Sequence, residues 1–173
     1  MSRLLILVAG LTIGLAMPAI AADLAKTGSL DIRTGWKAIG EVTQVAEKHT
    51  LAAGKVWGVS FNAAGSGPLH MGPAVCTYQA EGIEGTGVTQ GRCAWSDPDG
   101  DRIFSEYSGK FTPTSAAAGS STITSGTGKY AGIQGNGPFT CKVLNAANGQ
   151  SVCEQHFDYR LTTEATGSTT PSK

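Results

Sequence analysis

Short runs in which apolar and polar residues alternate recur along this chain, separated by glycine-rich turns. The clearest run spans residues 102–112. Alternation with a period of two predicts a β-strand with one buried face. The inward set is Ile103, Tyr107 and Phe111, and the outward set is Arg102, Glu106 and Lys110. Glu106 is therefore expected in solvent, where it would not gain the raised pKa of a buried acid or base.

Other stretches predict further strands, and few windows show helical spacing. Residues 30–39 and 41–46 form one long bent strand or two. Residues 63–68 and 114–120 are expected to be loops. The remaining predicted strands are 55–62, 72–81, 88–96, 121–124, 139–144 and 152–162. Many short strands with glycine turns predict an all-β barrel or sandwich.

Residues 126–141 contain five glycines within a short β-type run. Gly126 and Gly128 supply positive φ in a tight turn, after which residues 129–131 are expected to re-enter a strand. Gly132 and the two glycines that follow it mark a sharp bend or a close backbone approach. A phosphate-binding loop would open a helix, but Pro138 and a β-type run follow instead.

This segment resembles known families. Its Gly126-Thr127-Gly128-Lys129-Tyr130 turn, followed by Gly132 and Gly135, is similar to the glycine turn of dirigent proteins and to a segment of allene oxide cyclases. Secreted bacterial proteins of uncharacterised role share the pattern, often with an Asp-Gly-Asp turn upstream. The resemblance implies a single antiparallel β-barrel of about eight strands, allene oxide cyclase-like and calycin-like, over residues 35–163. It does not by itself imply an enzyme.

The two chain ends differ from the middle in composition. Residues 1–21 have the pattern of a secretory signal peptide, with Arg3, an apolar run and a small-x-small site that ends at Ala21. Residues 22–34 are expected to be a loose segment, and residues 164–173 a disordered tail. We therefore expect a periplasmic or extracellular protein with no membrane contact after cleavage.

The charge balance and the cysteine count bear on the partners and the compartment of the protein. Without Arg3, twelve basic residues face thirteen acidic ones, which argues against a nucleic-acid partner. In an oxidising compartment, four cysteines indicate disulfides. Three connectivities are possible, and hairpin geometry favours Cys76 with Cys93 and Cys141 with Cys153. A zinc site has no supporting Cys or His spacing.

The acidic run Asp97-Pro-Asp99-Gly-Asp101 has two interpretations. Alternating carboxylates in a glycine-containing turn suit Ca²⁺. Asp-Gly is also a favoured turn dipeptide, and solvated carboxylates suit a loop tip. The twelfth position of a calcium loop, where a bidentate Glu is needed, is Ser108. We predict a solvated turn and no metal, with these three residues as weak candidates.

The chain offers no clear catalytic set. His49, His70 and His156 are far apart, and each is expected to be a surface or structural residue. The chain has no nucleophile elbow around a serine. Early residues Glu41 and Glu47 do not align with the carboxylate, Asn and Pro of allene oxide cyclases. No cofactor is expected.

Two functional hypotheses remain. In the first, a non-catalytic barrel binds a small apolar ligand or a protein partner at its mouth, since an eight-stranded barrel holds side chains or one small ligand. In the second, an isomerase- or cyclase-like enzyme templates a reactive small molecule in the cavity. The candidate lumen residues are Trp57, Phe61, Tyr107 and Phe111. A packed lumen favours the first hypothesis, and an open cavity with buried carboxylates favours the second. The oligomeric state is open.

Overall fold

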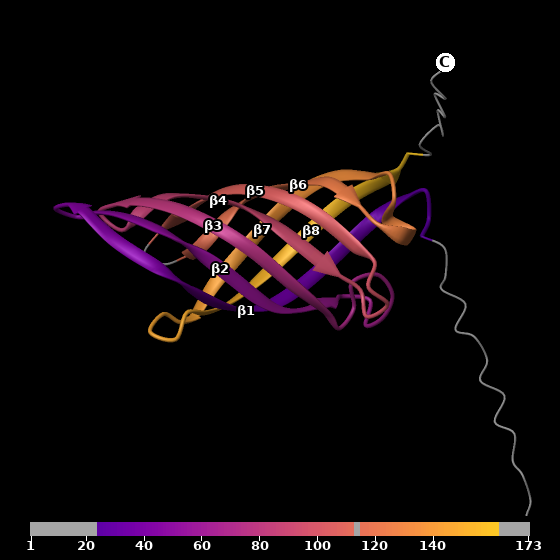
Figure 1. Cartoon of the computed structure of the whole chain (residues 1–173), viewed down its shortest axis with the longest axis horizontal. Helices are drawn as coiled ribbons and strands as arrows, with labels where there is room; N and C mark the ends of the chain where they lie inside the picture. The colour runs from indigo at the N-terminus through magenta and orange to yellow at the C-terminus, as the bar shows by residue number, and fades with distance from the viewer. Residues whose placement is uncertain (1–23, 113–114, 163–173) are drawn as a thin grey trace, which may run out of the picture.

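The protein is a closed antiparallel barrel of eight strands (Figure 1). The computed structural model describes residues 24–112 and 115–162. One 3₁₀ turn, η1, interrupts the strands before β7. The elements in chain order are β1 Thr27–Ala46, β2 His49–Asn62, β3 Gly72–Ile83, β4 Thr86–Ser96, β5 Arg102–Thr112, β6 Ser115–Gly126, η1 Gly128–Tyr130, β7 Ile133–Asn145 and β8 Gln150–Leu161. The predicted fold class is confirmed. Within these residues, no helix is long and apolar enough to cross a membrane.

Each strand pairs with the next one in sequence, and β8 closes the barrel against β1. Two ion pairs reinforce this seam between residues that face each other in register. Arg33 contacts Glu154 at 2.5 Å, and His156 Nδ1 contacts Asp31 Oδ1 at 2.7 Å. Between Thr27 and Lys37, the pairing with β8 leaves no free edge on that side of β1.

Several strand boundaries differ from those expected. The first two predicted segments are one strand that begins at Thr27, so residues 27–34 belong to the barrel rather than to a loose segment. Residues 115–120 belong to β6, where a loop was predicted. Residues 129–131 do not re-enter a strand, because η1 includes Tyr130 and β7 begins at Ile133. The predicted signal peptide and tail lie outside the described residues.

The two ends of the barrel are built differently. The hairpin turns between β1 and β2, β3 and β4, β5 and β6, and β7 and β8 lie at one end, the left in Figure 1. The other end carries the longer β2–β3 loop, the acidic β4–β5 turn and η1. At the hairpin end, the β1–β8 pairing stops at Lys37 and the β6–β7 pairing stops at Cys141. Beyond these points the barrel opens.

The apolar core fills the loop end. Trp95 contacts both Trp36 and Phe157 edge to face, with ring centroids 5.6 and 6.2 Å apart. Leu69 of the β2–β3 loop and Tyr130 of η1 are fully buried against this core. The core therefore closes one end of the barrel and leaves the hairpin end as its mouth.

Candidate functional site

Asp97 is the centre of a buried polar cluster that seals the loop end. Its side chain accepts a hydrogen bond from the Tyr130 hydroxyl at 2.6 Å and another from the backbone N–H of Leu69. The Lys129 ammonium lies 2.5 Å from the same carboxylate. The cluster joins the end of β4 to the β2–β3 loop and to η1. It holds Leu69 and Tyr130 in place as the plug of the barrel.

The cluster fixes the protonation of its members. Burial raises the pKa of Tyr130 far above its usual range, and the hydrogen bond to Asp97 raises it further. Burial alone would lower the pKa of Lys129, but hydrogen bonds to Asp97 and Asp99 outweigh that effect and raise it. Tyr130 therefore remains a proton donor and Lys129 remains a cation at neutral pH.

The prediction that the acidic turn is solvated is wrong for Asp97, whose side chain is only 2% exposed. Asp99 is exposed as predicted, and its pKa is lowered chiefly by its hydrogen bond to Lys129. The Asp101 carboxylate accepts a hydrogen bond from the backbone N–H of Lys129 at 3.0 Å. Among the described residues, no group of three or more His, Cys, Asp or Glu side chains is placed to hold a metal ion. The three carboxylates bind the glycine turn instead.

Gly128 makes this arrangement possible. Its φ is +54°, as predicted, and a Cβ atom there would lie 1.8 Å from Asp101 Oδ1. Only glycine combines that backbone conformation with such a close carboxylate. The glycine segment is therefore an architectural element of the sealed end.

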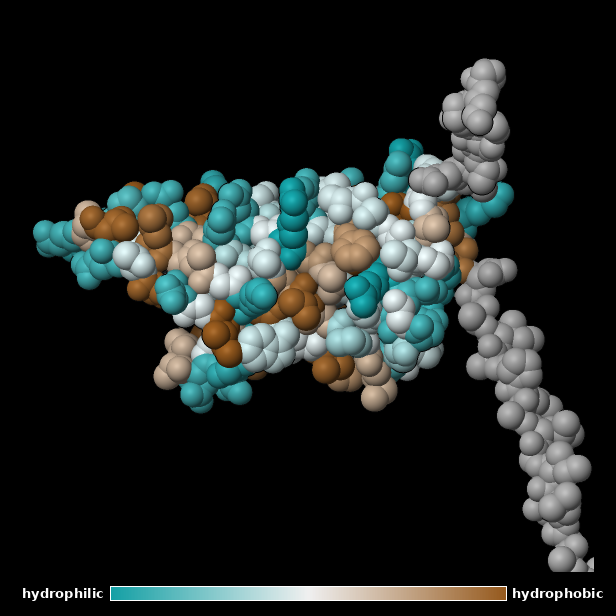
Figure 2. Space-filling view, viewed as in Figure 1, coloured by the Kyte–Doolittle hydropathy of each residue, from teal (hydrophilic) through white to brown (hydrophobic). Residues whose placement is uncertain are grey.

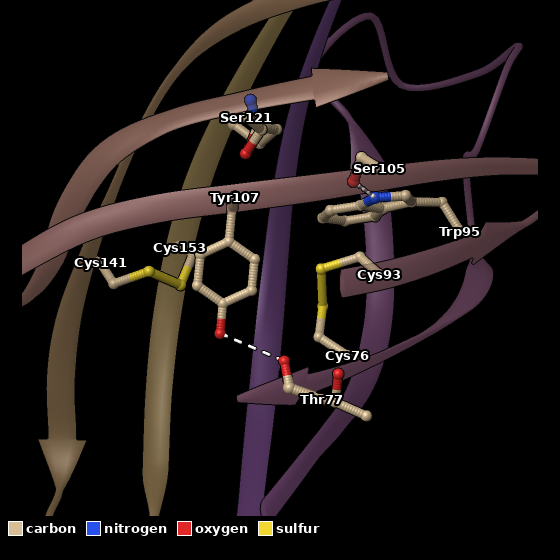
Figure 3. Close-up of a disulfide and its surroundings, with 10 residues drawn as sticks. Cys76, Thr77, Cys93, Trp95, Ser105, Tyr107, Ser121, Cys141 and Cys153 are labelled. Carbon is tan, nitrogen blue, oxygen red and sulfur yellow. Dashed lines mark hydrogen bonds between the residues drawn. A yellow bond between two sulfur atoms is a disulfide. The ribbon is translucent and has the colours of Figure 1, made fainter. Parts of the chain in front are cut away.

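Both predicted disulfides are present, and both face the interior (Figure 3). Cys76 lies directly opposite Cys93 on β3 and β4, and Cys141 directly opposite Cys153 on β7 and β8. In the view of Figure 3, the ring of Tyr107 projects between the two bridges, and its hydroxyl donates to the Thr77 carbonyl at 3.3 Å. Disulfides are typical of an oxidising compartment, periplasmic or extracellular.

Two of the four predicted lumen residues face the solvent and not the interior of the barrel. Tyr107 and Phe111 face inward, with Tyr107 edge to face with Phe139 at 5.6 Å. Trp57 and Phe61 are on the outer surface, 42% and 45% exposed, so their predicted orientation is wrong. The inner face of β2 carries smaller residues instead. A Cβ at Gly58, in register with Trp36, would lie 1.9 Å from the Gly35 carbonyl oxygen, so the two strands approach closely there.

The lumen also differs from that of an acid–base enzyme. Along the described strands, the inward positions carry no Asp, Glu, Lys, Arg or His. Glu106 is exposed as predicted, and Glu41 and Glu47 are exposed too. Burial raises the pKa of Tyr107 and of Tyr159, so these inward phenols are protonated at neutral pH. No described lumen side chain is then a general base near neutral pH.

The mouth carries a set of exposed apolar side chains that we call the apolar rim. Its members come from three hairpins, and each is at least 43% exposed. They are Ile39, Val42, Val45, Leu51, Ile83, Val88, Val143 and Leu144. Figure 2 shows hydrophobic residues at the hairpin end, scattered among hydrophilic ones. Eight of the thirteen exposed large apolar side chains among the described residues lie in this rim, and a gathering of exposed apolar side chains at one end indicates a candidate interaction site.

The three histidines are dispersed, as expected. His49 pairs with Glu81 at 2.9 Å, and His156 lies between Asp31 and Asp158. His70 packs edge to face on Phe61. The structure does not bring them together as a catalytic or metal-binding set.

Sequence reasoning missed the apolar rim and the Asp97 cluster. Six of the rim residues were assigned to strands without a separate role, and Leu51 and Ile83 were assigned to no element. The apolar residues near the ends of the predicted strands were a usable signal. Asp97 carried no such signal, because its partner Tyr130 is 33 residues away.

No protein-family model matches this chain, and no curated protein matches it either. Among solved structures, one that is similar is a pterocarpan synthase dirigent protein. The TM-score is 0.48 and the sequence identity 12%, over 87% of this chain and 98% of that one. The barrel itself is established by its own strand pairing.

Proposed function

We propose that this is a non-catalytic binding protein of an oxidising compartment, and that its apolar rim binds another protein. The observation that carries the proposal is the asymmetry of the barrel. One end is plugged by Leu69 and Tyr130, whereas the open end exposes eight large apolar side chains. Such a surface is stabilised when a partner covers it.

The chemistry of the mouth favours a protein over a membrane. Around the rim, residues 39–51, 81–88, 110–112 and 142–150 contain four carboxylates and three lysines. An apolar centre with charges of both signs at its edge is typical of protein interfaces. A membrane-binding surface would carry an excess of basic residues.

A photo-crosslinking residue at Leu144 tests this proposal in the cell that makes the protein. The same residue at the exposed Ala131, at the sealed end, is the control. We expect one predominant crosslinked protein from Leu144 and none from Ala131. The crosslink should weaken strongly in the Val42→Ser plus Ile83→Ser variant, whose changes lie on other hairpins and at exposed positions.

Three results would contradict the proposal. They are an identical pattern from both positions, a crosslink to a second copy alone, and flotation of the purified protein with phosphatidylcholine vesicles. Mass spectrometry of the band identifies the partner, and a thermal melt of each variant shows that it is folded.

A further inference from the structure

A groove crosses the outer face of the barrel from β1 to β6, and its lining is more polar on one side and more apolar on the other. Two adjoining hollows, of about 700 and 930 Å³, share one row of residues. That row is Ala53, Gln79, Gln90, Ser108 and Ser120. Consecutive members are direct partners in register, so the row runs straight across the strands. Four spacings of ~4.8 Å make it about 19 Å long.

Inward-facing glycines explain why the outer wall is hollow here. Four of the five row residues are sequence neighbours of a glycine. A Cβ at Gly91 would lie 1.9 Å from the Thr77 carbonyl oxygen, and one at Gly119 would lie 2.0 Å from that of Ser108. Neighbouring strands therefore approach each other closely at the glycines, which have no side chain. Glycines in strands also allow the sheet to bend, and the bend makes the outer face concave.

The groove presents polar groups that the protein leaves unused. No side-chain hydrogen bond within the described residues involves the amides of Gln79 and Gln90 or the hydroxyls of Ser108 and Ser120. Arg92 lies in register with Glu106 along one side, yet the two form no ion pair among the described residues. These are donors and acceptors available to a ligand.

We propose that this groove binds a neutral glycan chain. Adjacent amides and hydroxyls match the paired hydroxyl groups of sugars, each of which both donates and accepts. Leu51 and Val88, on the other side of the row, offer apolar surface to the C–H faces of the sugar rings. Two basic and three acidic residues line the hollows, so a polyanion gains no net attraction. Every row residue is paired with a neighbouring strand on both sides, so an extended peptide cannot add a strand to the sheet here.

Native gel electrophoresis through dissolved polysaccharides tests the proposal. The probes are glucomannan, xyloglucan and dextran as neutral polymers, with polygalacturonate as the anionic comparison. We expect at least one neutral polymer to retard the protein. The Gln79→Ala plus Gln90→Ala variant should bind about tenfold more weakly, because two hydrogen-bonding amides are lost. The control is Asn136→Ala plus Thr140→Ala, two exposed positions on β7, outside the groove.

Each outcome either supports or overturns the proposed glycan site. Retardation by a neutral polymer that the groove variant loses and the control keeps supports the site. The proposal is overturned by no retardation in any neutral polymer, by retardation in polygalacturonate alone, or by equal loss in both variants. The Val42→Ser plus Ile83→Ser variant should keep full glycan binding, because neither residue lines the groove. Thermal melts of all variants confirm folding.

Discussion

The hydroxyl of Tyr130 donates a 2.6 Å hydrogen bond to Asp97 Oδ2, and both side chains are buried. This contact links η1 to the end of β4 across the loop end of the barrel. A buried carboxylate that loses a partner retains its desolvation penalty.

The first prediction concerns this contact. Tyr130→Phe should lower the free energy of unfolding by about 1–3 kcal/mol, because Asp97 loses a buried donor. Asp97→Asn should cost about 2–4 kcal/mol, since it also breaks the buried pair with Lys129. Urea denaturation measures both. The control is Asp99→Asn, whose carboxylate is exposed and should leave the midpoint unchanged. Equal midpoints for Asp97→Asn and Asp99→Asn would restore the solvated-turn interpretation.

The second prediction concerns the disulfides. Unfolded, non-reduced protein should give no thiol adduct, because the four cysteines form two bridges. Replacing either pair by alanine should lower the free energy of unfolding by about 3 kcal/mol, from the chain-entropy cost of loops this short. Thiol labelling with mass spectrometry and denaturant titration measure the two effects. A stoichiometric adduct in the wild type would rule out the pairing.

The third prediction separates backbone strain from steric contact. Gly128 and Gly65 both have positive φ, +54° and +75°, but only Gly128 has a carboxylate where a Cβ would go. Gly65→Ala should cost about 1–2 kcal/mol from conformation alone. Gly128→Ala should lower the free energy of unfolding clearly more, because the Asp101 carboxylate must move and lose its hydrogen bond from the backbone N–H of Lys129. Thermal melts compare the two variants. Similar losses of stability in both would show that the steric contact with Asp101 adds nothing to the cost of the backbone conformation.

The fourth prediction concerns the seam between β1 and β8. Hydrogen bonds that the His156 ring donates to the Asp31 carboxylate, which has the larger effect, and to the Asp158 carboxylate raise the pKa of His156 above its ordinary value of 6.5. Its stabilising contribution is therefore full below pH 6.5 and is lost as the pH rises through the higher folded pKa. The effect should be small, because the site is exposed. Nuclear magnetic resonance should report a raised pKa in the wild type and a lower one in Asp31→Asn. A pKa that is the same in both would exclude the assigned cause.

Local pattern predicted much of the fold. Strand β5 has the predicted bounds, since Ile103, Tyr107 and Phe111 share the inward face throughout its length. The β3–β4 turn lies at Glu84 and Gly85, both with positive φ, and it places Cys76 opposite Cys93 as expected. In such segments, turn chemistry and side-chain period determine the structure without help from distant residues.

The wrong predictions concern residues whose structure depends on contacts with residues far away in the sequence. Residues 115–120 are small and weakly apolar, and pairing with β5 and β7 makes them a strand despite low propensity. Trp57 was expected inside, yet its strand turns the opposite face inward, with Gly58 beside Trp36 and Ser60 buried. Asp97 was assigned to solvent because its turn sequence is polar. None of these outcomes is encoded within a window of neighbouring residues.

The seam has a further consequence for how the barrel is presented. Thr27 of β1 lies opposite Arg160 of β8, so the two outer ends of the barrel chain emerge side by side at the sealed end. The apolar rim lies at the other end, on the β1–β2, β3–β4 and β7–β8 hairpins (Figure 1). Any tether, fused domain or surface attached through either strand end would therefore hold the barrel by its closed base. The mouth would then face away from the point of attachment.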